Sequence, residues 1–237
     1  MADHEYSGHV DPGGEAAVRR LEGLEIRKLS VGPMDNNAYL LTCRSTGAQL
    51  LIDAAADADA LRRLVAAGAA GAAGTTGAPG AAEPRLDLIV TTHRHHDHVG
   101  ALAEMVAATG ARTAAGAEDA PALPVPVDLP LADGDVLEIG QHSVEIIHLR
   151  GHTPGSIAVL WRGGEAGDHL FTGDSLFPGG VGNTERDPQR FTQLLDDVQQ
   201  RLFDRLGDET WVYPGHGDDT TLGAERASLP EWRERGW

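Results

Sequence analysis

The chain has 237 residues, of which 41% are hydrophobic and 23% are charged, as is ordinary for a globular protein. This length suits one domain with at most a small appendage. The formal net charge of -17 argues against nucleic acid as a partner, because binding a phosphate backbone requires clustered Lys and Arg.

The single cysteine, Cys43, excludes an intrachain disulfide, and its apolar neighbours predict a buried, inert thiol. The first residues are polar and acidic and show no secretory signal pattern. No stretch approaches the ~18 apolar residues of a membrane span. We therefore expect a cytoplasmic protein that does not contact a membrane; the sequence does not indicate its oligomeric state.

The first half of the chain predicts strands, a helix and an insertion. Residues 1–22 are rich in Gly, Asp and Glu and predict a disordered leader before a domain spanning 23–237. A helix is expected from Asp59 to Ala67, and the Ala-, Gly- and Thr-rich segment 68–84 predicts a flexible surface insertion. Four runs have strand composition: Leu24–Leu29, Asn37–Cys43, Gln49–Ile52 and Leu86–Val90.

The second half predicts two further helices among strands. Apolar residues at helical spacing between Val99 and Val106 indicate a helix that ends at Gly110. Another helix begins with Asp187 as its N-cap and Pro188 in its first turn, and ends at Gly207. The expected strands are Val136–Ile139, Val144–Leu149, Ile157–Trp161, His169–Thr172 and Thr210–Tyr213.

The run from His93 to His98 is the strongest chemical signal. Four histidines and one aspartate fall within six residues, directly after the apolar run Leu86–Val90. Loops at strand ends are where a scaffold presents functional groups, and imidazole and carboxylate suit zinc, iron or manganese. A surface loop that happens to be rich in histidine would not be expected to follow a buried strand so directly. The run therefore predicts a metal site.

Three more polar residues occupy similar junctions. His152, Asp174 and His216 each follow a predicted strand and each has a glycine beside it, which lets backbone approach a crowded centre closely. Each of these residues alone is a weak signal. Together with the His93–His98 run they place metal-binding side chains after four predicted strands, in three cases beside a glycine.

These motifs, in the order His-x-His-x-Asp-His, Gly-His-Thr-Pro-Gly-Ser, Thr-Gly-Asp and Pro-Gly-His, resemble those of the metallo-β-lactamase superfamily. The similarity runs from about Ile26 to the end of the chain. Within the superfamily, the segment 171–177 and the tail 214–226 resemble short bacterial glyoxalase II-like thioesterases. The resemblance implies an αββα sandwich of two mixed sheets flanked by helices, with the site at one edge.

The resemblance also implies a ligand set for two divalent cations, zinc first, with iron or manganese as alternatives. It assigns His93, His95 and His152 to the first cation, and Asp97, His98 and His216 to the second. Asp174 would bridge both cations, and Asp97 and Asp174 would be the catalytic carboxylates. Asp53 matches a position that braces the His-rich loop, a role that metal ligands require of their neighbours.

The chemistry expected of such a site is hydrolysis by a metal-activated hydroxide, with the acyl carbonyl polarised by a cation. Asp174 argues against β-lactam hydrolysis, because family members with that activity have Cys or Ser nearby. The expected substrate is a small acyl-thiol or ester. Asn183 stands where glyoxalase II-like sequences commonly have Arg, which leaves the thiol open between glutathione, mycothiol and another carrier.

Three other functions remain as alternatives. The first is a persulfide dioxygenase that holds one iron with His93, His152 and Asp174. The second is a lactonase or other ester hydrolase, since one ligand set serves several reactions. The third, a non-catalytic metal-binding scaffold, is disfavoured because all seven ligands are intact.

Overall fold

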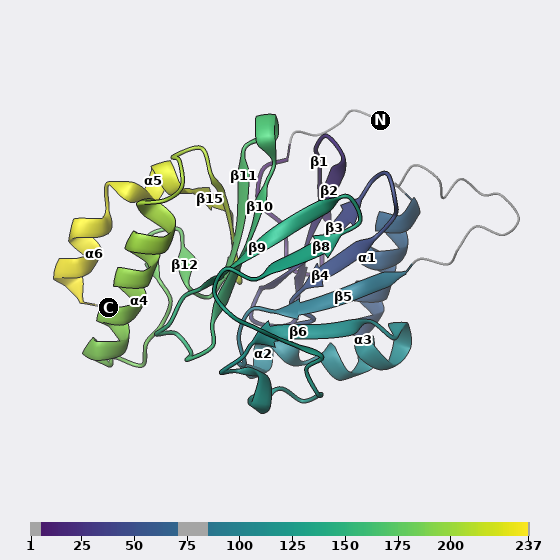
Figure 1. Ribbon diagram of the computed structural model, residues 1–237, viewed down its shortest axis with the longest axis horizontal. Coiled ribbons are helices and arrows are strands. Elements are labelled where there is room, and N and C mark those ends of the chain that lie inside the picture. Colours follow the sequence, from purple (N-terminus) through teal and green to yellow (C-terminus); the bar gives the residue numbers. More distant parts are fainter. Residues whose placement is uncertain (1–5, 71–84, 237) are drawn as a thin grey trace, which may run out of the picture.

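Two β-sheets lie face to face at the centre of the molecule, and helices cover the outer face of each sheet (Figure 1). The structure is a computed structural model, which describes residues 6–70 and 85–236. The arrangement is the αββα sandwich that the motifs imply, so the fold prediction is confirmed. Such layering buries the apolar face of each sheet and of each helix.

The first sheet has seven strands in sequence order. The first four strands are antiparallel, and the pairs from β4 to β7 are parallel. The parallel half requires crossover connections, which the helices beside it provide. The strands are β1 (Ala17–Arg20), β2 (Leu24–Val31), β3 (Asn36–Cys43), β4 (Gln49–Ile52), β5 (Leu86–Thr91), β6 (Arg112–Gly116) and β7 (Leu129–Leu131).

The second sheet has six strands in the order β15-β14-β11-β10-β9-β8. All neighbours in it are antiparallel except β11 and β14. Its strands are β8 (Val136–Ile139), β9 (His142–His148), β10 (Ile157–Arg162), β11 (Asp168–Gly173), β14 (Trp211–Pro214) and β15 (Thr220–Thr221). A separate hairpin follows β11 and consists of β12 (Leu176–Phe177) and β13 (Gly180–Val181).

The core between the sheets is built from apolar side chains of both. Tyr39 from the first sheet lies edge-on to Phe171 of the second, with ring centroids 5.2 Å apart. Phe171 stacks on Tyr213 at 4.5 Å, a geometry that adds to the gain from burial. Both sheets are therefore fixed to each other beneath the edge where their loops meet.

Helices cover the two outer faces. On the first sheet lie α1 (Ala58–Ala70) and α3 (Leu102–Thr109), and their buried residues pack on the outward side chains of β3, β4 and β5. On the second sheet lie α4 (Pro188–Val198), a π-turn (Gln199–Phe203), α5 (Leu222–Arg226) and α6 (Leu229–Arg235). The short remaining elements are α2 (His96–Val99) and 3₁₀ turns at Ala120–Ala122 and Gly164–Ala166.

The prediction of a disordered leader over residues 1–22 is wrong for its described part. Residues 17–20 form β1, which pairs antiparallel with β2. Tyr6 packs beside Trp211 and donates a hydrogen bond to Asp219 at 2.7 Å. The Gly- and acid-rich composition hid these contacts, because the partners come from distant parts of the chain. Residues 1–5 lie outside the described part.

Two strands of the first sheet, β6 and β7, were not expected. The sequence of β6 is Arg-Thr-Ala-Ala-Gly, and β7 contains Pro130, so neither has ordinary strand composition. The helix predicted to end at Ala67 continues to Ala70. Most of the predicted insertion 68–84 lies outside the described residues. Within the described part, no helix is long and apolar enough to cross a membrane.

Candidate metal centre

The predicted metal ligands follow the ends of four strands. β9, β11 and β14 run in the same direction, because β9 and β11 are both antiparallel to β10 and β14 is parallel to β11. His152, Asp174 and His216 follow these three strands, and His93 follows β5 of the other sheet. The carboxyl ends of these strands therefore bring their loops to one edge of the sandwich.

The structure brings all seven predicted ligands together. Asp97 and His98 lie on the single helical turn α2, which begins at His96 and turns the chain back toward the site. Ligand atoms within 4.8 Å of one another form three groups: His93, His95 and His152; His93, His98 and Asp174; and Asp97, His98 and His216. His96, which the sequence places between ligands, has a side chain that is 90% exposed, and its Nδ1 lies 3.8 Å from Oδ1 of Asp97.

Imidazole nitrogens approach one another closely in this cluster. Nε2 of His93 lies 3.1 Å from Nδ1 of His95 and 3.2 Å from Nε2 of His152. Nε2 of His98 lies 3.2 Å from Nε2 of His216. Converging nitrogen lone pairs repel each other unless a proton or a cation lies between them. This donor set of imidazole and carboxylate is the one that zinc and iron prefer.

Asp174 lies between the two halves of the cluster. Its Oδ1 is 3.3 Å from Nε2 of His98, and its Oδ2 is 3.6 Å from Nε2 of His152 and 3.5 Å from Nε2 of His216. Burial raises the pKa of this carboxyl, but the imidazoles of His216 and His98 outweigh burial and hold the pKa far below its usual range. Oδ1 is buried and receives no hydrogen bond from the described residues. An ionised, partly unpartnered oxygen at this place fits a cation-binding role.

The pKa shifts of the candidate ligand histidines differ across the cluster. Burial lowers the pKa of His93 well below its ordinary value, and the neighbouring His98 lowers it further. A neutral imidazole has a lone pair to offer a metal. Burial also lowers the pKa of His98, but the Asp53 and Asp174 carboxylates raise it to about 10. The carboxylates thus create a negative potential that favours a cation at this point.

The Asp53 carboxylate accepts three hydrogen bonds at the His-rich loop. Its Oδ1 accepts the main-chain N–H of Thr92 at 2.7 Å. Its Oδ2 accepts the Thr92 hydroxyl at 2.7 Å and Nδ1–H of His98 at 2.9 Å. Nδ1 of His93 lies 3.1 Å from the same hydroxyl oxygen. One buried carboxylate therefore orients two of the candidate ligands, directly or through Thr92.

Three other candidate ligands, His152, His216 and Asp97, have similar partners, which sequence patterns do not indicate. Nδ1 of His152 donates to the main-chain oxygen of Asn183 at 2.8 Å, because a carbonyl only accepts. Nδ1 of His216 donates to the main-chain oxygen of Met34 at 2.8 Å. Each bond places the proton on Nδ1 and leaves Nε2 free to bind a metal. The side-chain amide of Asn36 donates to Oδ2 of Asp97 at 3.0 Å and orients that carboxylate.

Asp119 joins two ligand loops and belongs to no motif that the sequence shows. Its fully buried carboxylate accepts the main-chain N–H of Arg94 at 3.0 Å from the His-rich loop. The same carboxylate accepts the Thr153 hydroxyl at 2.5 Å and the N–H of Gly155 at 2.9 Å from the loop of His152. Asp119 precedes the 3₁₀ turn in an Ala- and Pro-rich stretch that carries no motif.

Glycine is required where backbone crosses close to the ligands. A Cβ atom at Gly215 would lie 2.1 Å from Oδ1 of Asp174 and 2.8 Å from Cε1 of His98. A Cβ atom at Gly182 would lie 1.7 Å from the main-chain oxygen of Asp174. Any side chain at either position would push the loops apart. Both positions therefore require glycine, because the main chain there lies against the ligand loops.

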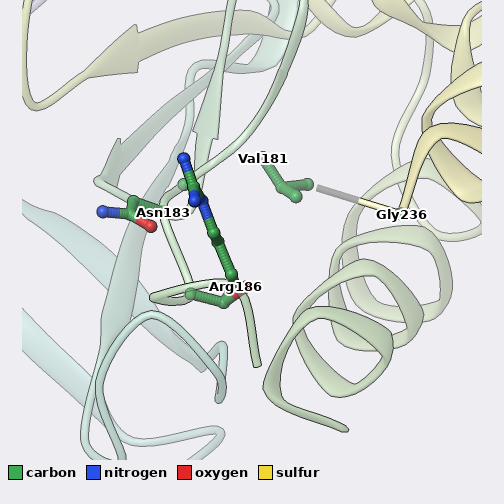
Figure 2. Close-up of a pocket in the computed structure, with 6 residues that line it drawn as sticks. Val181, Asn183, Arg186 and Gly236 are labelled. Carbon is green, nitrogen blue, oxygen red and sulfur yellow. The ribbon is translucent and has the colours of Figure 1, made fainter. Parts of the chain in front are cut away.

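One of two cavities in this part of the molecule is lined by candidate ligands. One, of about 420 Å³, is lined in part by His95 and His152 themselves. The other, of about 660 Å³, lies against the segment from Val181 to Arg186. In it the side chain of Arg186 extends between Asn183 and Val181, opposite Gly236 (Figure 2). This second cavity is connected to the cluster through Asn183, whose main-chain oxygen accepts the Nδ1–H of His152.

Comparison with known proteins places the chain in context. A hydroxyacylglutathione hydrolase of Fuscovulum blasticum is 40% identical over 183 residues, which are 77% of this chain and 62% of that protein. The crystal structure of ETHE1 from Myxococcus xanthus has a TM-score of 0.71 and 26% identity, covering 88% of this chain and 84% of that one. The crystal structure of TTHA1623 in a di-iron-bound form has a TM-score of 0.64 and 30% identity. The match covers 86% of this chain and 98% of that chain.

The chain thus spans less than two thirds of the length of that hydrolase. The family model for the metallo-beta-lactamase superfamily matches residues 31–216, a range that contains every ligand and supporting residue described above. Fold, motif order and family model agree, and the chain belongs to the metallo-β-lactamase superfamily.

Proposed function

We propose that this chain is a two-metal thioesterase of the glyoxalase II type, acting on a small acyl-thiol. The observation that carries the proposal is the position of Asp174, whose two oxygens face His98 on one side and His152 and His216 on the other. A carboxylate so placed is suited to bridge two cations. The 40% identity to a hydroxyacylglutathione hydrolase supports the same reaction class.

The ligand residues would divide between two sites. His93, His95 and His152 would hold one cation. Asp97, His98 and His216 would hold the other, and Asp174 would contact both. When bound, two divalent cations supply a hydroxide at neutral pH, by lowering the pKa of water toward ~7, and polarise the acyl carbonyl.

The protein's own groups would hold and direct the reactants. Oδ2 of Asp97 is fixed by the amide of Asn36 and is 3.3 Å from Nε2 of His216. Asp97 is partly exposed, so its carboxylate can accept a proton from attacking water and orient the water's lone pair toward the acyl carbon. The hydrogen bonds at Nδ1 of His98, His152 and His216 keep the imidazoles from turning during the reaction.

An iron-dependent persulfide dioxygenase is the second candidate. It would use one iron held by His93, His152 and Asp174. The structural similarity to ETHE1 fits this alternative, and Nε2 of His152 is within 3.6 Å of both other ligands. The intact second group of Asp97, His98 and His216 favours the two-metal hydrolase, because a single iron leaves those three residues without a function.

Replacement of Asp174 by Ala tests the hydrolase. Asp174→Ala should lower kcat/KM for S-lactoyl thioesters more than about 100-fold. The expected loss is larger than the loss usual for a residue that only orients a ligand, because Asp174 would itself be a ligand. Metal content should fall as well. The substrates to assay are S-lactoyl esters of glutathione, mycothiol and coenzyme A, beside a lactone and a phosphodiester.

Asp168→Ala is the matched control, since Asp168 begins the strand β11 that Asp174 follows and pairs only with Arg162 among the described residues. It should keep full activity and full metal content. Unchanged thioester turnover in Asp174→Ala would contradict the bridging role. Turnover of the lactone alone by the parent protein would assign the site to another ester.

A further inference from the structure

The guanidinium of Arg190 makes three hydrogen bonds, two of them to the loop that carries His152. Its Nε donates to the main-chain oxygen of Gly151 at 2.9 Å, and one Nη donates to the main-chain oxygen of His152 at 2.6 Å. The other Nη donates to Oε2 of Glu185 at 2.7 Å. Because the guanidinium is planar and its N–H groups point in fixed directions, one side chain fixes two successive carbonyl groups relative to a third acceptor.

These contacts form part of a closed ring of four residues. Nδ1–H of His152 donates to the main-chain oxygen of Asn183 at 2.8 Å. The side-chain oxygen of Asn183 accepts the main-chain N–H of Glu185 at 2.8 Å. Arg190 then joins Glu185 back to the main chain of His152. The ring therefore holds both the backbone of His152 and the acceptor of its ring proton.

Helix α4 places Arg190 where the ring requires it. The N-cap residue Asp187 accepts the main-chain N–H of Arg190 at 3.1 Å and fixes the first turn of the helix. The loop lies so close that a Cβ atom at Gly151 would be 2.5 Å from the main-chain oxygen of Arg190. Glu185 and Arg186 both have positive φ, at 57° and 61°, a conformation that persists only where neighbours hold it.

We propose that Arg190 is a positioning residue for His152. By fixing the backbone of His152 and the Asn183 carbonyl together, it sets the direction in which Nε2 points and thereby the affinity of the site formed with His93 and His95. Nε2 of His152 lies 3.2 Å from Nε2 of His93, so a small rotation of the ring would separate the ligand atoms. The inference rests on the metal site of the proposed function and adds a residue outside the ligand set.

The inference also gives Asn183 a role. The side-chain oxygen of Asn183 accepts the N–H two residues ahead, a local bond that Asn forms readily and that steers the chain into the left-handed region at Glu185. An arginine at this position would not accept that N–H. The residue here thus supports the ring around His152.

Arg226 provides a matched control on the same side of the molecule. Its guanidinium also donates to two main-chain oxygens, those of Phe203 and Leu206, and to one carboxylate, that of Asp208. Its side chain is 35% exposed, against 32% for Arg190. None of its partners is a candidate ligand. Loss of Arg226 therefore costs the same kinds of bond without touching His152.

The test compares Arg190→Met with Arg226→Met in the full chain. Each protein is freed of metal and titrated with Co²⁺, and both the dissociation constant and the visible absorption spectrum are recorded. Arg190→Met should weaken Co²⁺ binding by about 10- to 100-fold, the range typical for loss of a ligand's partner, and should alter the spectrum. Arg226→Met should leave both readouts unchanged, while thermal unfolding of the two metal-free variants should shift to a similar extent.

Arg190→Lys serves if the methionine variant does not fold. Lysine keeps the positive charge but cannot reach both carbonyls and Glu185 at once. The Co²⁺ affinity of Arg190→Lys should therefore lie between that of the parent and that of a variant without the guanidinium N–H donors. Equal Co²⁺ affinity in parent and Arg190 variants would overturn the inference, as would an equal loss in Arg226→Met. Thioester hydrolysis is measured separately: a parent protein that binds Co²⁺ tightly and hydrolyses no thioester overturns the proposed function, whereas the affinities still decide the role of Arg190.

Discussion

At the level of single residues, Asp53 has the largest share of the support for the metal centre. Its carboxylate holds Thr92 by two bonds and His98 by one, and it has positive φ at 58°. Asn and Asp tolerate that backbone better than other non-glycine residues do. The same position that bends the chain out of β4 therefore also fixes the proton on Nδ1 of His98 and leaves Nε2 for a cation.

Asp53→Asn should weaken metal binding without unfolding the protein. Asn keeps the size and the backbone preference of Asp, but its amide presents N–H groups and one oxygen, so it no longer accepts all three bonds. The expected loss of metal affinity is about 10- to 100-fold, measured by competition with a chelator. Asp57→Asn is the control, since Asp57 also has positive φ but lies outside the cluster. Equal affinities in both variants would contradict the supporting role of Asp53.

Sequence could indicate the ligands but only one of their supporting residues. Asp174 and His216 each stand beside glycine at a strand end, and His93 opens a run of four histidines after a strand, so their chemistry is visible in the sequence. Asp119 acts by accepting main-chain N–H groups, and Asn183 acts through its own main-chain oxygen. Asp119 binds residues 25 positions before it and 34 positions after it, so only the folded chain brings those groups together.

At the level of elements, β2 carries a buried charge that fixes the loop after His216. Lys28 is the only lysine of the sequence and its side chain is fully buried. Its Nζ donates to the main-chain oxygens of Gly8 and Gly217 and to Oδ1 of Asp219, each at 2.7 Å. The pair thus joins the N-terminal segment, β2 and the segment that follows the metal ligand.

Lys28→Met should lower the free energy of unfolding by about 3–5 kcal/mol, because it leaves the Asp219 carboxylate buried without its counter-charge. Urea denaturation of the metal-free protein measures this loss. The double variant Lys28→Met with Asp219→Leu removes both charges and should recover much of the stability. A loss below about 1 kcal/mol in the single variant would show that Asp219 is solvated or neutral in the folded protein.

The strands show where the pattern of a sequence is informative. The central strands could be predicted because each is an apolar run between turn residues, as Gln49–Ile52 and Ile157–Arg162 are. β1 and β6 could not, since β1 is a short polar strand at a sheet edge and β6 consists largely of Ala and Gly. Their strand conformation comes from pairing with β2 and β5, which supply the hydrogen bonds that their composition does not favour.

At the level of the whole molecule, the centre depends on the complete sandwich. Its ligands and supports extend from Met34 to His216 and come from both sheets, so neither sheet alone contains a full site. The net charge of -17 also favours a metal centre, because an acidic chain attracts divalent cations and repels polyanions. The cavity of about 420 Å³ that His95 and His152 line in part has room for a small molecule.

The most direct test of the two-metal thioesterase is metal analysis of the purified protein together with parallel assays of thioester hydrolysis and oxygen consumption. We predict about two transition-metal ions per chain, hydrolysis of an S-lactoyl thioester that chelation abolishes and metal restores, and no oxygen uptake with a thiol persulfide. One iron per chain with steady oxygen uptake on the persulfide, and no thioester hydrolysis, would contradict the account.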